Sequence, residues 1–157
     1  MRAKWISFDQ TKWTLIGRNM DSLSNSLNPQ VEQSQDVCGY TYLEHKGYQP
    51  QADIEYKCND TDDIYENIVD IVNGLAKDEA TCGAYMIDAT LNKEVKDGDT
   101  ETLTGKGYKV PVVIIPSEDG GDTGSWTITF SAYENGARVA GTVSVANGAP
   151  TFTADNG

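Results

Sequence analysis

The most regular pattern in the chain is an alternation of apolar and small polar residues in its last third. Residues 126–133 place Trp, Ile, Phe and Ala at every second position, which is the period expected of a strand with one buried face. Residues 139–145 repeat the alternation with valine. Asn135 and Gly136 lie between the two runs, and this dipeptide tolerates the positive φ values of a tight turn. The pattern therefore predicts a long antiparallel hairpin.

The polar face of this expected hairpin carries hydroxyl groups and no charge. Its hydroxyl residues are Thr127, Thr129, Ser131, Thr142 and Ser144. Solvent-exposed sheets of monomeric proteins usually carry lysine and glutamate, which keep strands of different molecules apart. A small, uncharged face is suited to contact another surface. An ordinary sandwich with weakly polar strands fits the periodicity equally well.

Further strands are expected upstream. Residues 4–18 contain two apolar-rich runs and predict an N-terminal hairpin, and the polar residues 19–30 predict a loop that closes with Asn28-Pro29. Residues 31–44 alternate as one extended strand. A turn at Gly47–Pro50 then leads into the alternating residues 52–58, so 31–58 is expected to form a second long hairpin.

The second half of the chain is expected to add strands up to residue 153. Residues 84–91 alternate, and 108–115 are apolar on both faces, as in a strand covered on two sides. The charged, turn-rich residues 93–107 predict a surface loop. Residues 117–122 predict a loop into the C-terminal hairpin.

One helix is expected, over residues 62–75. Its apolar stripe comprises Ile64, Ile68, Ile71, Val72 and Leu75, and the acidic residues 60–63 are suited to cap its N-terminus. Together these elements predict one domain, residues 1–157, with a mainly β fold. We expect a β-sandwich or small barrel of antiparallel strands with one flanking α-helix.

The composition of the chain restricts the classes of function that it can have. The formal net charge of −12 excludes a conventional nucleic-acid binder, which needs clustered lysine and arginine, but it is compatible with a conduit that DNA only passes. The three cysteines are an odd number and fit a reducing compartment. No signal peptide or membrane span is expected. His45 has no Cys or His at ligand spacing, and motifs of nucleophilic or phosphate chemistry are missing, so we expect no enzyme, metal or cofactor.

Several segments, in the right order, carry a resemblance to a known family. They are Gly-Gly-Asp-Thr-Gly at 120–124, Asn-Gly-Ala-Arg-Val-Ala-Gly-Thr at 135–142, the closing Pro-Thr-Phe-Thr-Ala-Asp at 150–155, and upstream stretches at 31–37, 47–51 and 62–66. This ordered set resembles the major tail (tail tube) proteins of long-tailed, siphovirus-type phages of Gram-positive hosts. The match is poorest from 77 to 109.

The resemblance implies an architecture and partners. Tail tube proteins are similar in fold to the type VI secretion tube protein, a small barrel-like sandwich flanked by a helix. Their subunits join strands into hexameric rings, which stack into a hollow tube around a tape-measure protein. Such a protein would be assembled in the host cytoplasm, would reside in the virion tail and would meet tail terminator and baseplate or distal tail proteins. Double-stranded DNA would pass through its lumen without specific binding, and no membrane or cofactor would be involved.

The resemblance also assigns residues to surfaces. Glu32, Ser34 and Asp36 would face the lumen, the five hydroxyl residues of the C-terminal hairpin would lie between subunits, and a third set would lie between rings: Asn25, Asn28 and Pro29. From the residues alone, 31–44 is as compatible with a solvent-exposed edge strand. The alternative function is a monomeric immunoglobulin-like or carbohydrate-binding module.

Overall fold

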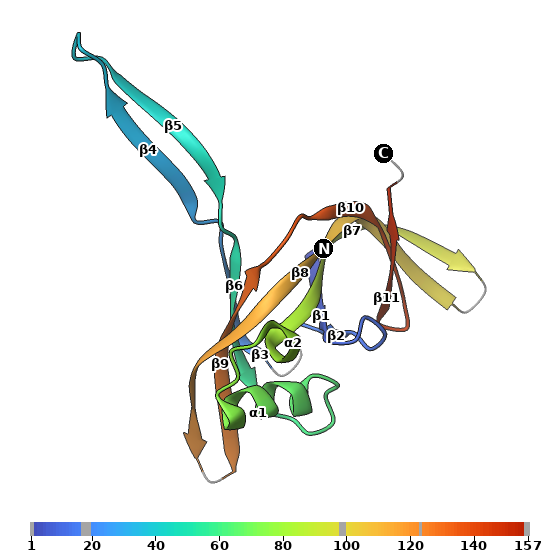
Figure 1. The fold of residues 1–157 in the computed structure, drawn as a ribbon. Coiled ribbons are helices and arrows are strands. Elements are labelled where there is room, and N and C mark those ends of the chain that lie inside the picture. The colour runs from blue at the N-terminus through green and yellow to red at the C-terminus, as the bar shows by residue number, and fades with distance from the viewer. Residues whose placement is uncertain (1, 17–19, 98–99, 123, 156–157) are drawn as a thin grey trace.

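A computed structural model describes residues 2–16, 20–97, 100–122 and 124–155. Within these residues the chain forms eleven strands and two short helices (Figure 1). The elements are β1 (Arg2–Ser7), β2 (Thr14–Leu15), β3 (Met20–Ser26), β4 (Pro29–Gln35), β5 (Thr41–Tyr48), β6 (Gln51–Lys57), α1 (Tyr65–Gly74), α2 (Glu79–Cys82), β7 (Gly83–Asp97), β8 (Thr100–Asp122), β9 (Ser125–Glu134), β10 (Val139–Ala146) and β11 (Ala149–Ala154).

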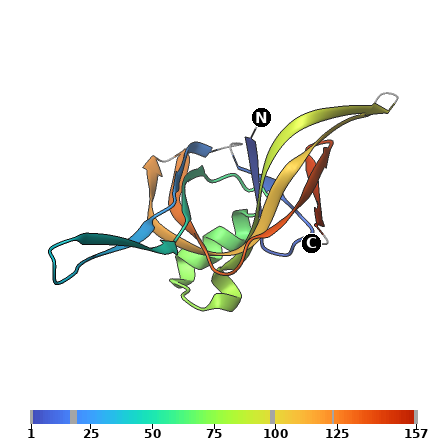
Figure 2. The same ribbon diagram turned by 90° about the horizontal axis from the view of Figure 1, so that it is seen from above.

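Nine of these strands form one antiparallel sheet. Its path is β2-β1-β7-β8-β9-β6-β3, and β10 pairs with both β8 and β11. The sheet curves around a core and the two helices lie at one side of it (Figure 2). The remaining strands, β4 and β5, pair only with each other. The expected mainly β, antiparallel fold is therefore confirmed, with a second helix that the sequence did not indicate.

The C-terminal hairpin expected from Asn135-Gly136 does not form. β9 pairs with residues 112–122 of β8, whereas β10 pairs with residues 102–109 of the same strand. Both run antiparallel to β8, so they follow one another along it in the same direction. Pro111 lies between the part of β8 that pairs with β9 and the part that pairs with β10. Its carbonyl accepts the Asn135 N–H at 2.9 Å. Proline has no N–H for a continued ladder, so the change of pairing at this point fits its chemistry.

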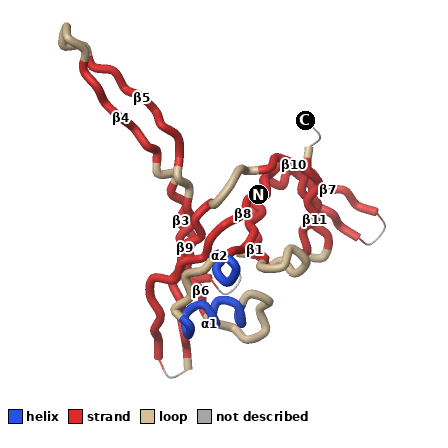
Figure 3. Tube along the Cα trace, viewed as in Figure 1, coloured by secondary structure: helices blue, strands red, loops and turns tan. Residues whose placement is uncertain are grey.

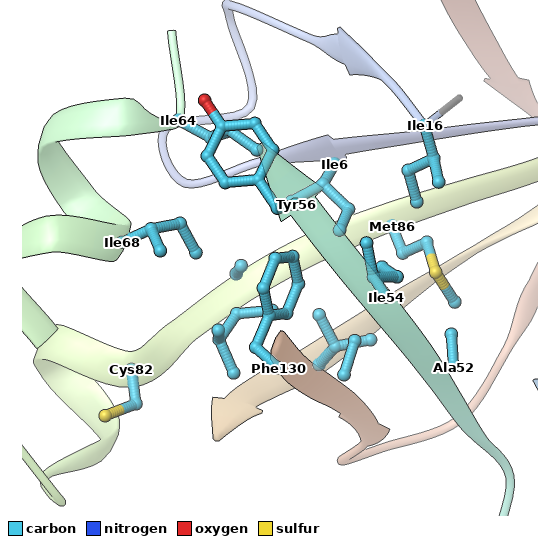
Figure 4. Packing of buried hydrophobic residues seen from close by; sticks show 14 of the residues in the cluster. Ile6, Ile16, Ala52, Ile54, Tyr56, Ile64, Ile68, Cys82, Met86 and Phe130 are labelled. Carbon is cyan, nitrogen blue, oxygen red and sulfur yellow. The ribbon is translucent and has the colours of Figure 1, made fainter. Parts of the chain in front are cut away.

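The main core lies inside the curved sheet. The side chains of Ile54, Tyr56 and Phe130 from β6 and β9 pack there against Ile68 of α1 and Met86 of β7, and each is at most 1% exposed (Figure 4). A polar contact joins β1 to β3, the strand at the far end of the sheet path. Lys4 of β1 donates a hydrogen bond to Oδ1 of Asn25 in β3, with 2.6 Å between the atoms. The arrangement is a nearly closed barrel.

A second cluster covers the opposite face of β1 and β7. Trp5 packs there with Ile87, Ala89, Leu91 and Val143, and Phe152 of β11 lies against them partly buried. Apolar residues thus line both faces of β1 and β7. From β8 only Leu103 joins this second cluster, whereas Val110, Val112 and Ile114 of the run 108–115 lie in the main core, and Ile115 at the end of the run is 49% exposed.

The helix expected over 62–75 is α1. Ile64, Ile68 and Ile71 are buried as the stripe predicts, but Leu75 adopts the left-handed conformation of the C-cap and is 86% exposed. The acidic residues before α1 do not cap it through a side chain. Instead Asp62 accepts a hydrogen bond from the Tyr56 hydroxyl at 2.9 Å, which anchors the segment to β6.

Three expected loops are strands. Residues 20–26 form β3, 93–97 and 100–107 extend β7 and β8, and 117–122 continue β8 in pairing with β9. Residues 17–19 of the expected N-terminal hairpin and loop lie outside the described residues, while β1 and β2 pair as expected. These polar segments have weak β propensity, but each pairs with a neighbouring strand of the sheet. Their backbone N–H and C=O groups gain hydrogen-bond partners in this way, and this gain outweighs the weak propensity.

The hairpin expected over 31–58 is divided differently. Residues 29–35 and 41–48 pair as β4 and β5 around a turn at 36–40, and β6 pairs with β3 and β9 instead of β5. The alternation of residues 31–44 continues through the turn, which is why periodicity alone merges two strands into one.

Candidate assembly interface

Strands β4 and β5 form a ribbon that projects from the body of the molecule (Figures 1 and 3). We call residues 29–48 the projecting ribbon. Every residue of β4 and every residue of β5 except Gly47 is exposed. Large apolar side chains remain in water along it, including Leu43 at 71% and Val37 at 104% exposure. A two-stranded hairpin of this kind is marginally stable in water alone, so the ribbon is suited to be covered by another surface.

The ribbon has two distinct faces. Glu32 and Ser34 lie opposite Glu44 and Tyr42 in the register and so share one face. Lys46 bridges the two glutamates on that face, its Nζ lying 3.2 Å from Glu32 and 2.9 Å from Glu44. The other face holds three apolar or aromatic-ring residues and polar amides: Val31, Leu43 and His45 with Gln33 and Gln35. One face is thus charged and the other largely uncharged.

Asp36 has a role that the sequence did not indicate. It stands after the end of β4, and its Oδ1 accepts the N–H groups of Cys38 and Tyr40, each at 2.9 Å. Its Oδ2 accepts from the Tyr42 hydroxyl at 3.1 Å. The hydrogen bond from the Tyr40 backbone is the main cause that lowers the pKa of Asp36. Its carboxylate therefore shapes the tip of the ribbon and contacts Tyr42, which lies on the face of Glu32 and Ser34.

We predict that Asp36→Ala loosens the tip without changing the global stability of the subunit. The substitution removes three acceptor contacts from an exposed turn that is remote from the core. Faster hydrogen exchange at the amides of Cys38 and Tyr40, with an unchanged urea midpoint, is the expected result. Asp36→Asn keeps one acceptor oxygen and serves as the intermediate variant. Exchange rates equal to those of the parent would show that the turn does not depend on this carboxylate.

The base of the ribbon is fixed by hydrogen bonds. The Gln49 N–H donates to the carbonyls of Leu27 and Asn28, and the Asn28 side chain donates to the Gln49 carbonyl at 3.0 Å. Pro29 begins β4 beside them. Of the residues assigned to a contact between rings, Asn28 and Pro29 therefore lie together at the base, whereas Asn25 lies on β3 and binds Lys4.

The five hydroxyl residues fall on two strands that are not neighbours. Thr127, Thr129 and Ser131 lie on β9, between β8 and β6, and all three are partly buried. Ser131 donates to Oδ1 of Asp53 at 2.5 Å, so part of this row is satisfied within the subunit. Thr142 and Ser144 lie on β10, between β8 and β11. No strand edge is formed by either set.

Among the described residues the sheet has three edge strands, β3, β11 and the two-residue β2. β3 pairs only with β6 and β11 only with β10, so one side of each ladder is unpaired within the described residues. β11 has the sequence Ala-Pro-Thr-Phe-Thr-Ala and contains no charged residue, and β3 contains only Asp21. Soluble proteins usually protect such edges with lysine or with a cover. The sequence pattern did not indicate β3 and β11 as edges, because residues 20–26 resemble a polar loop and the alternation at 149–154 does not identify a partner strand.

A network of charges lies where β1, β7 and β8 meet. Asp88 is 3% exposed and lies 2.9 Å from Nζ of Lys4 and 2.7 Å from the Arg2 guanidinium. The Tyr108 hydroxyl donates to it at 3.1 Å. Burial alone would raise the pKa of Asp88, but hydrogen bonds and charges from Arg2 and Lys4 outweigh burial and hold that pKa below its ordinary value. The arrangement connects the N-terminal strand β1 to β7 and β8.

Among the described residues, no group of three His, Cys, Asp or Glu side chains could hold a metal ion. In the same part of the chain, Cys38, Cys58 and Cys82 are free thiols, and burial is the main cause that raises the pKa of Cys58 and Cys82. As far as the chain is described, none of its helices has the length and apolar character needed to cross a membrane.

Comparison with known proteins gives a weak structural likeness. No family model and no curated protein matches the sequence. Among solved structures, the fold is similar to a chain in "Cryo-EM structure of the anti-feeding prophage (AFP) baseplate, 6-fold symmetrised", with 11% sequence identity and a TM-score of 0.45. The match covers 90% of this chain and 91% of that chain. A likeness of this degree carries no argument about function.

Proposed function

We propose that this protein is a structural virion protein, the subunit of a phage tail tube. Copies would join through their sheets into hexameric rings, and the rings would stack into a hollow tube that conducts the DNA genome during ejection. The observation that carries the proposal is the projecting ribbon. It exposes apolar side chains along its whole length, although it receives no cover from its own subunit.

The energetic argument favours association over a free ribbon. Covering a large apolar side chain stabilises a complex by about 1.5–3 kcal/mol before ordering costs. Val31, Val37 and Leu43 are each at least half exposed on the ribbon. A neighbouring copy that covers these side chains supplies the packing surface that an isolated two-stranded hairpin lacks.

The edge strands β3 and β11, which carry one charged residue between them, support closure into a ring. β3 and β11 lie at different ends of the hydrogen-bonded network of strands, so an edge-to-edge contact would join β11 of one copy to β3 of the next. Such a head-to-tail contact uses two different surfaces and closes if the rotation between copies divides a full turn. Backbone hydrogen bonds would then continue from subunit to subunit.

Within this tube, Glu32 and Ser34 are proposed to face the bore, with Asp36 at the tip beside them. The net charge of −12 then keeps phosphate from binding as DNA slides past. The hydroxyl residues of β9 and β10 are proposed to line surfaces between subunits. Asn28 and Pro29, at the base of the ribbon, would contact the adjacent ring, together with Asn25. The tape-measure, terminator and distal tail proteins would be the partners, and no cofactor takes part.

Purified protein is expected to form rings or tubes. Negative-stain microscopy combined with sedimentation velocity over a wide concentration range measures this directly. Because tail subunits can wait for a nucleus, the same measurement is repeated with sonicated fragments of assembled material as seeds. A species that sediments as a monomer under all of these conditions would contradict the proposal. Glycan binding by that monomer, through the exposed ring residues Tyr40, Tyr42 and Tyr48, would favour the carbohydrate-binding alternative.

A further inference from the structure

The side chain of Lys4 lies between an amide and a carboxylate. Its Nζ is 2.6 Å from the side-chain carbonyl oxygen of Asn25 and 2.9 Å from Oδ2 of Asp88. Lys4 is 5% exposed and Asp88 is 3% exposed, so the amine and the carboxylate are both withdrawn from water. A lysine nitrogen, an amide and a buried proton acceptor thus meet at one point of the barrel, supplied by β1, β3 and β7.

Asp88 is held in place from two other sides. Arg2 donates to both carboxylate oxygens, with 3.0 Å from Nε to Oδ1 and 2.7 Å from Nη2 to Oδ2, and the Tyr108 hydroxyl lies 3.1 Å from Oδ2. Asn25, by contrast, is an exposed residue of β3. A small molecule released from its amide can therefore reach water, while the carboxylate stays fixed beside the amine.

These three groups are the ones that an exchange between an amide and an amine requires. The amine is the nucleophile, the amide carbon is the electrophile, and the carboxylate moves protons between them. Groups held about 3–3.5 Å apart react far more readily than the same groups free in solution. Because Cγ of Asn25 is bonded to the oxygen that Lys4 contacts, a small rotation of the amide brings this carbon within that range of Nζ.

We propose that Lys4 and Asn25 become joined by an isopeptide bond, with Asp88 moving the protons. The Lys4 ammonium passes a proton to Asp88, and the free electron pair of Nζ attacks Cγ of Asn25. As the bond from Cγ to the amide nitrogen breaks, Asp88 gives its proton to that nitrogen and takes one from Nζ. The amide nitrogen leaves as ammonia, which carries the last proton into water as ammonium. One ammonium is consumed and one is released, so the reaction needs no oxidant, reductant or other reactant.

Arg2 is expected to make the reaction slow. Burial would raise the pKa of Asp88, but hydrogen bonds and charges from Arg2 and Lys4 hold that pKa below its ordinary value. A carboxylate of low pKa rarely accepts a proton from a lysine, so the chain first folds with the ion pair intact and the bond forms afterwards. Measurements of the ion pair itself are therefore made on freshly folded, unlinked protein.

The bond would close the barrel covalently. β1 and β3 do not pair with each other in the described sheet, and the hydrogen bond from Lys4 to Asn25 connects them. A covalent link at these two residues turns the chain between them into a closed loop, which limits the freedom of the unfolded chain. The inference goes beyond the proposed function and does not depend on it, because a subunit can become linked whether or not it assembles.

Intact-mass spectrometry of the full chain tests the bond. After incubation, the parent is expected to have a mass lower than that of its sequence by one molecule of ammonia, and its digest should contain a branched peptide that joins Lys4 to Asn25. Lys4→Arg keeps the positive charge beside Asp88 but removes the attacking amine. Asn25→Ala removes the amide from an exposed position, so this variant is expected to fold. Both variants should keep their full mass over the same incubation.

Two controls identify the source of the ammonia. An asparagine that precedes glycine, as Asn73 does, can also lose ammonia by closing a ring with the backbone. Asn73→Ala is therefore the matched control and should still give the branched peptide. Lys109 offers an internal comparison, because its contact with the Gln10 amide is 3.3 Å long and exposed to water. We expect no branched peptide from that pair.

Arg2→Gln tests the part assigned to Asp88. Glutamine can still donate a hydrogen bond but has no charge, so Asp88 becomes a stronger base, and the loss of ammonia should be roughly two- to tenfold faster. Arg2 is 62% exposed, so the variant is expected to fold. An unchanged or lower rate would overturn the assignment of Asp88 as the group that moves the protons.

The outcomes for the isopeptide bond are separate from those for the tube. A parent chain that keeps its full mass after prolonged incubation overturns the bond and leaves Lys4 in an ordinary buried ion pair. A loss of ammonia that persists in Asn25→Ala or Lys4→Arg overturns it as well. Neither result bears on the tube proposal, which microscopy tests, and a failure to form tubes does not change the mass of the subunit.

Discussion

Replacing both Thr151 and Thr153 of β11 with lysine is expected to abolish ring formation while the subunit stays folded. Both threonines are exposed on an edge strand that has no charge of its own. Lysines on an edge oppose strand addition, because the incoming strand must accommodate charged side chains beside its backbone. Sedimentation velocity should show a monomer at concentrations where the parent forms rings. Thermal unfolding of the monomer should change little, since both positions face solvent.

The control for this experiment is Thr90→Lys, which is compared with the single edge variant Thr153→Lys. Thr90 is also an exposed threonine, but β7 has β1 and β8 on its two sides. A lysine there adds one positive charge to the sheet without reaching an edge. We expect this control to assemble more readily than the edge variant. Rings formed by the edge variant at parental concentrations would show that β11 is not the joining strand.

The periodicity of the sequence predicts correctly which side chains of a strand are buried. It does not predict which strands lie next to one another. Ile128, Phe130 and Val143 are fully buried, as their alternation indicates. The same alternation says nothing about which strand lies alongside. β9 and β10 could form a hairpin or follow one another along a longer strand, and both arrangements bury the same side chains. The 23 residues of β8 decide between them, because only a strand of that length offers room for two in tandem.

The length of β8 was hidden by its polar first half. Residues 100–107 contain Thr, Lys, Glu and Gly and look like a loop by composition. Gly105 and Gly107 lie so close to the backbone of β7 that an added Cβ would be 1.9 Å from the Thr90 carbonyl oxygen and 2.3 Å from that of Asp88. These glycines permit close approach of two strands, so here they mark a crowded ladder and not a turn.

In the candidate interface, too, the alternation of residues does not show where one strand ends and the next begins. The alternation of residues 31–44 predicts one strand that carries the acidic residues, and it therefore does not indicate the turn that exposes Val37. A signal was present, because Asp36 precedes Gly39, whose φ of +85° is a conformation that glycine adopts readily. An aspartate that can accept backbone N–H groups, three residues before a glycine, is typical of a turn.

The charge network around Asp88 could have been suspected from the sequence. Lys4 and Asp88 are single charges inside otherwise apolar alternating runs, and such residues are almost never buried unless they are paired. The register of β1 and β7 places them directly opposite one another. Lys4 also binds Asn25, so one buried ammonium connects β1, the first strand of the chain, to β3, the last strand of the sheet path. Closure of the barrel depends on this polar contact as well as on apolar packing.

The second large effect is expected from Asp88→Asn, which should lower the free energy of unfolding by about 3–5 kcal/mol at pH 7. The substitution leaves the Lys4 ammonium, 5% exposed, without its counter-charge. Arg2, at 62% exposure, can turn to water and suffers less. Urea denaturation measures the loss. Asp70→Asn on the exposed face of α1 is the matched control and should change the stability by less than about 0.5 kcal/mol.

The loss of stability caused by Asp88→Asn should be larger at pH 7 than in strong acid. The pKa of Asp88 is lower in the folded state than in the unfolded state, so its ionisation stabilises the fold at every pH above the unfolded value of about 3.9. That stabilisation is lost as the pH falls through the folded pKa. The difference between Asp88→Asn and the parent should therefore be full at pH 7 and should shrink in strong acid, where the parent carboxyl is also neutral.

A double variant separates an unpaired charge from a lost contact. Lys4→Met in the Asp88→Asn background removes the buried ammonium and keeps most of the side-chain volume. If the unpaired charge causes the loss, the double variant should recover much of the stability, and the coupling between the two sites should exceed about 1 kcal/mol. Losses that simply add would mean that Lys4 and Asp88 stabilise the barrel independently, with the Lys4–Asn25 hydrogen bond as the dominant link between β1 and β3.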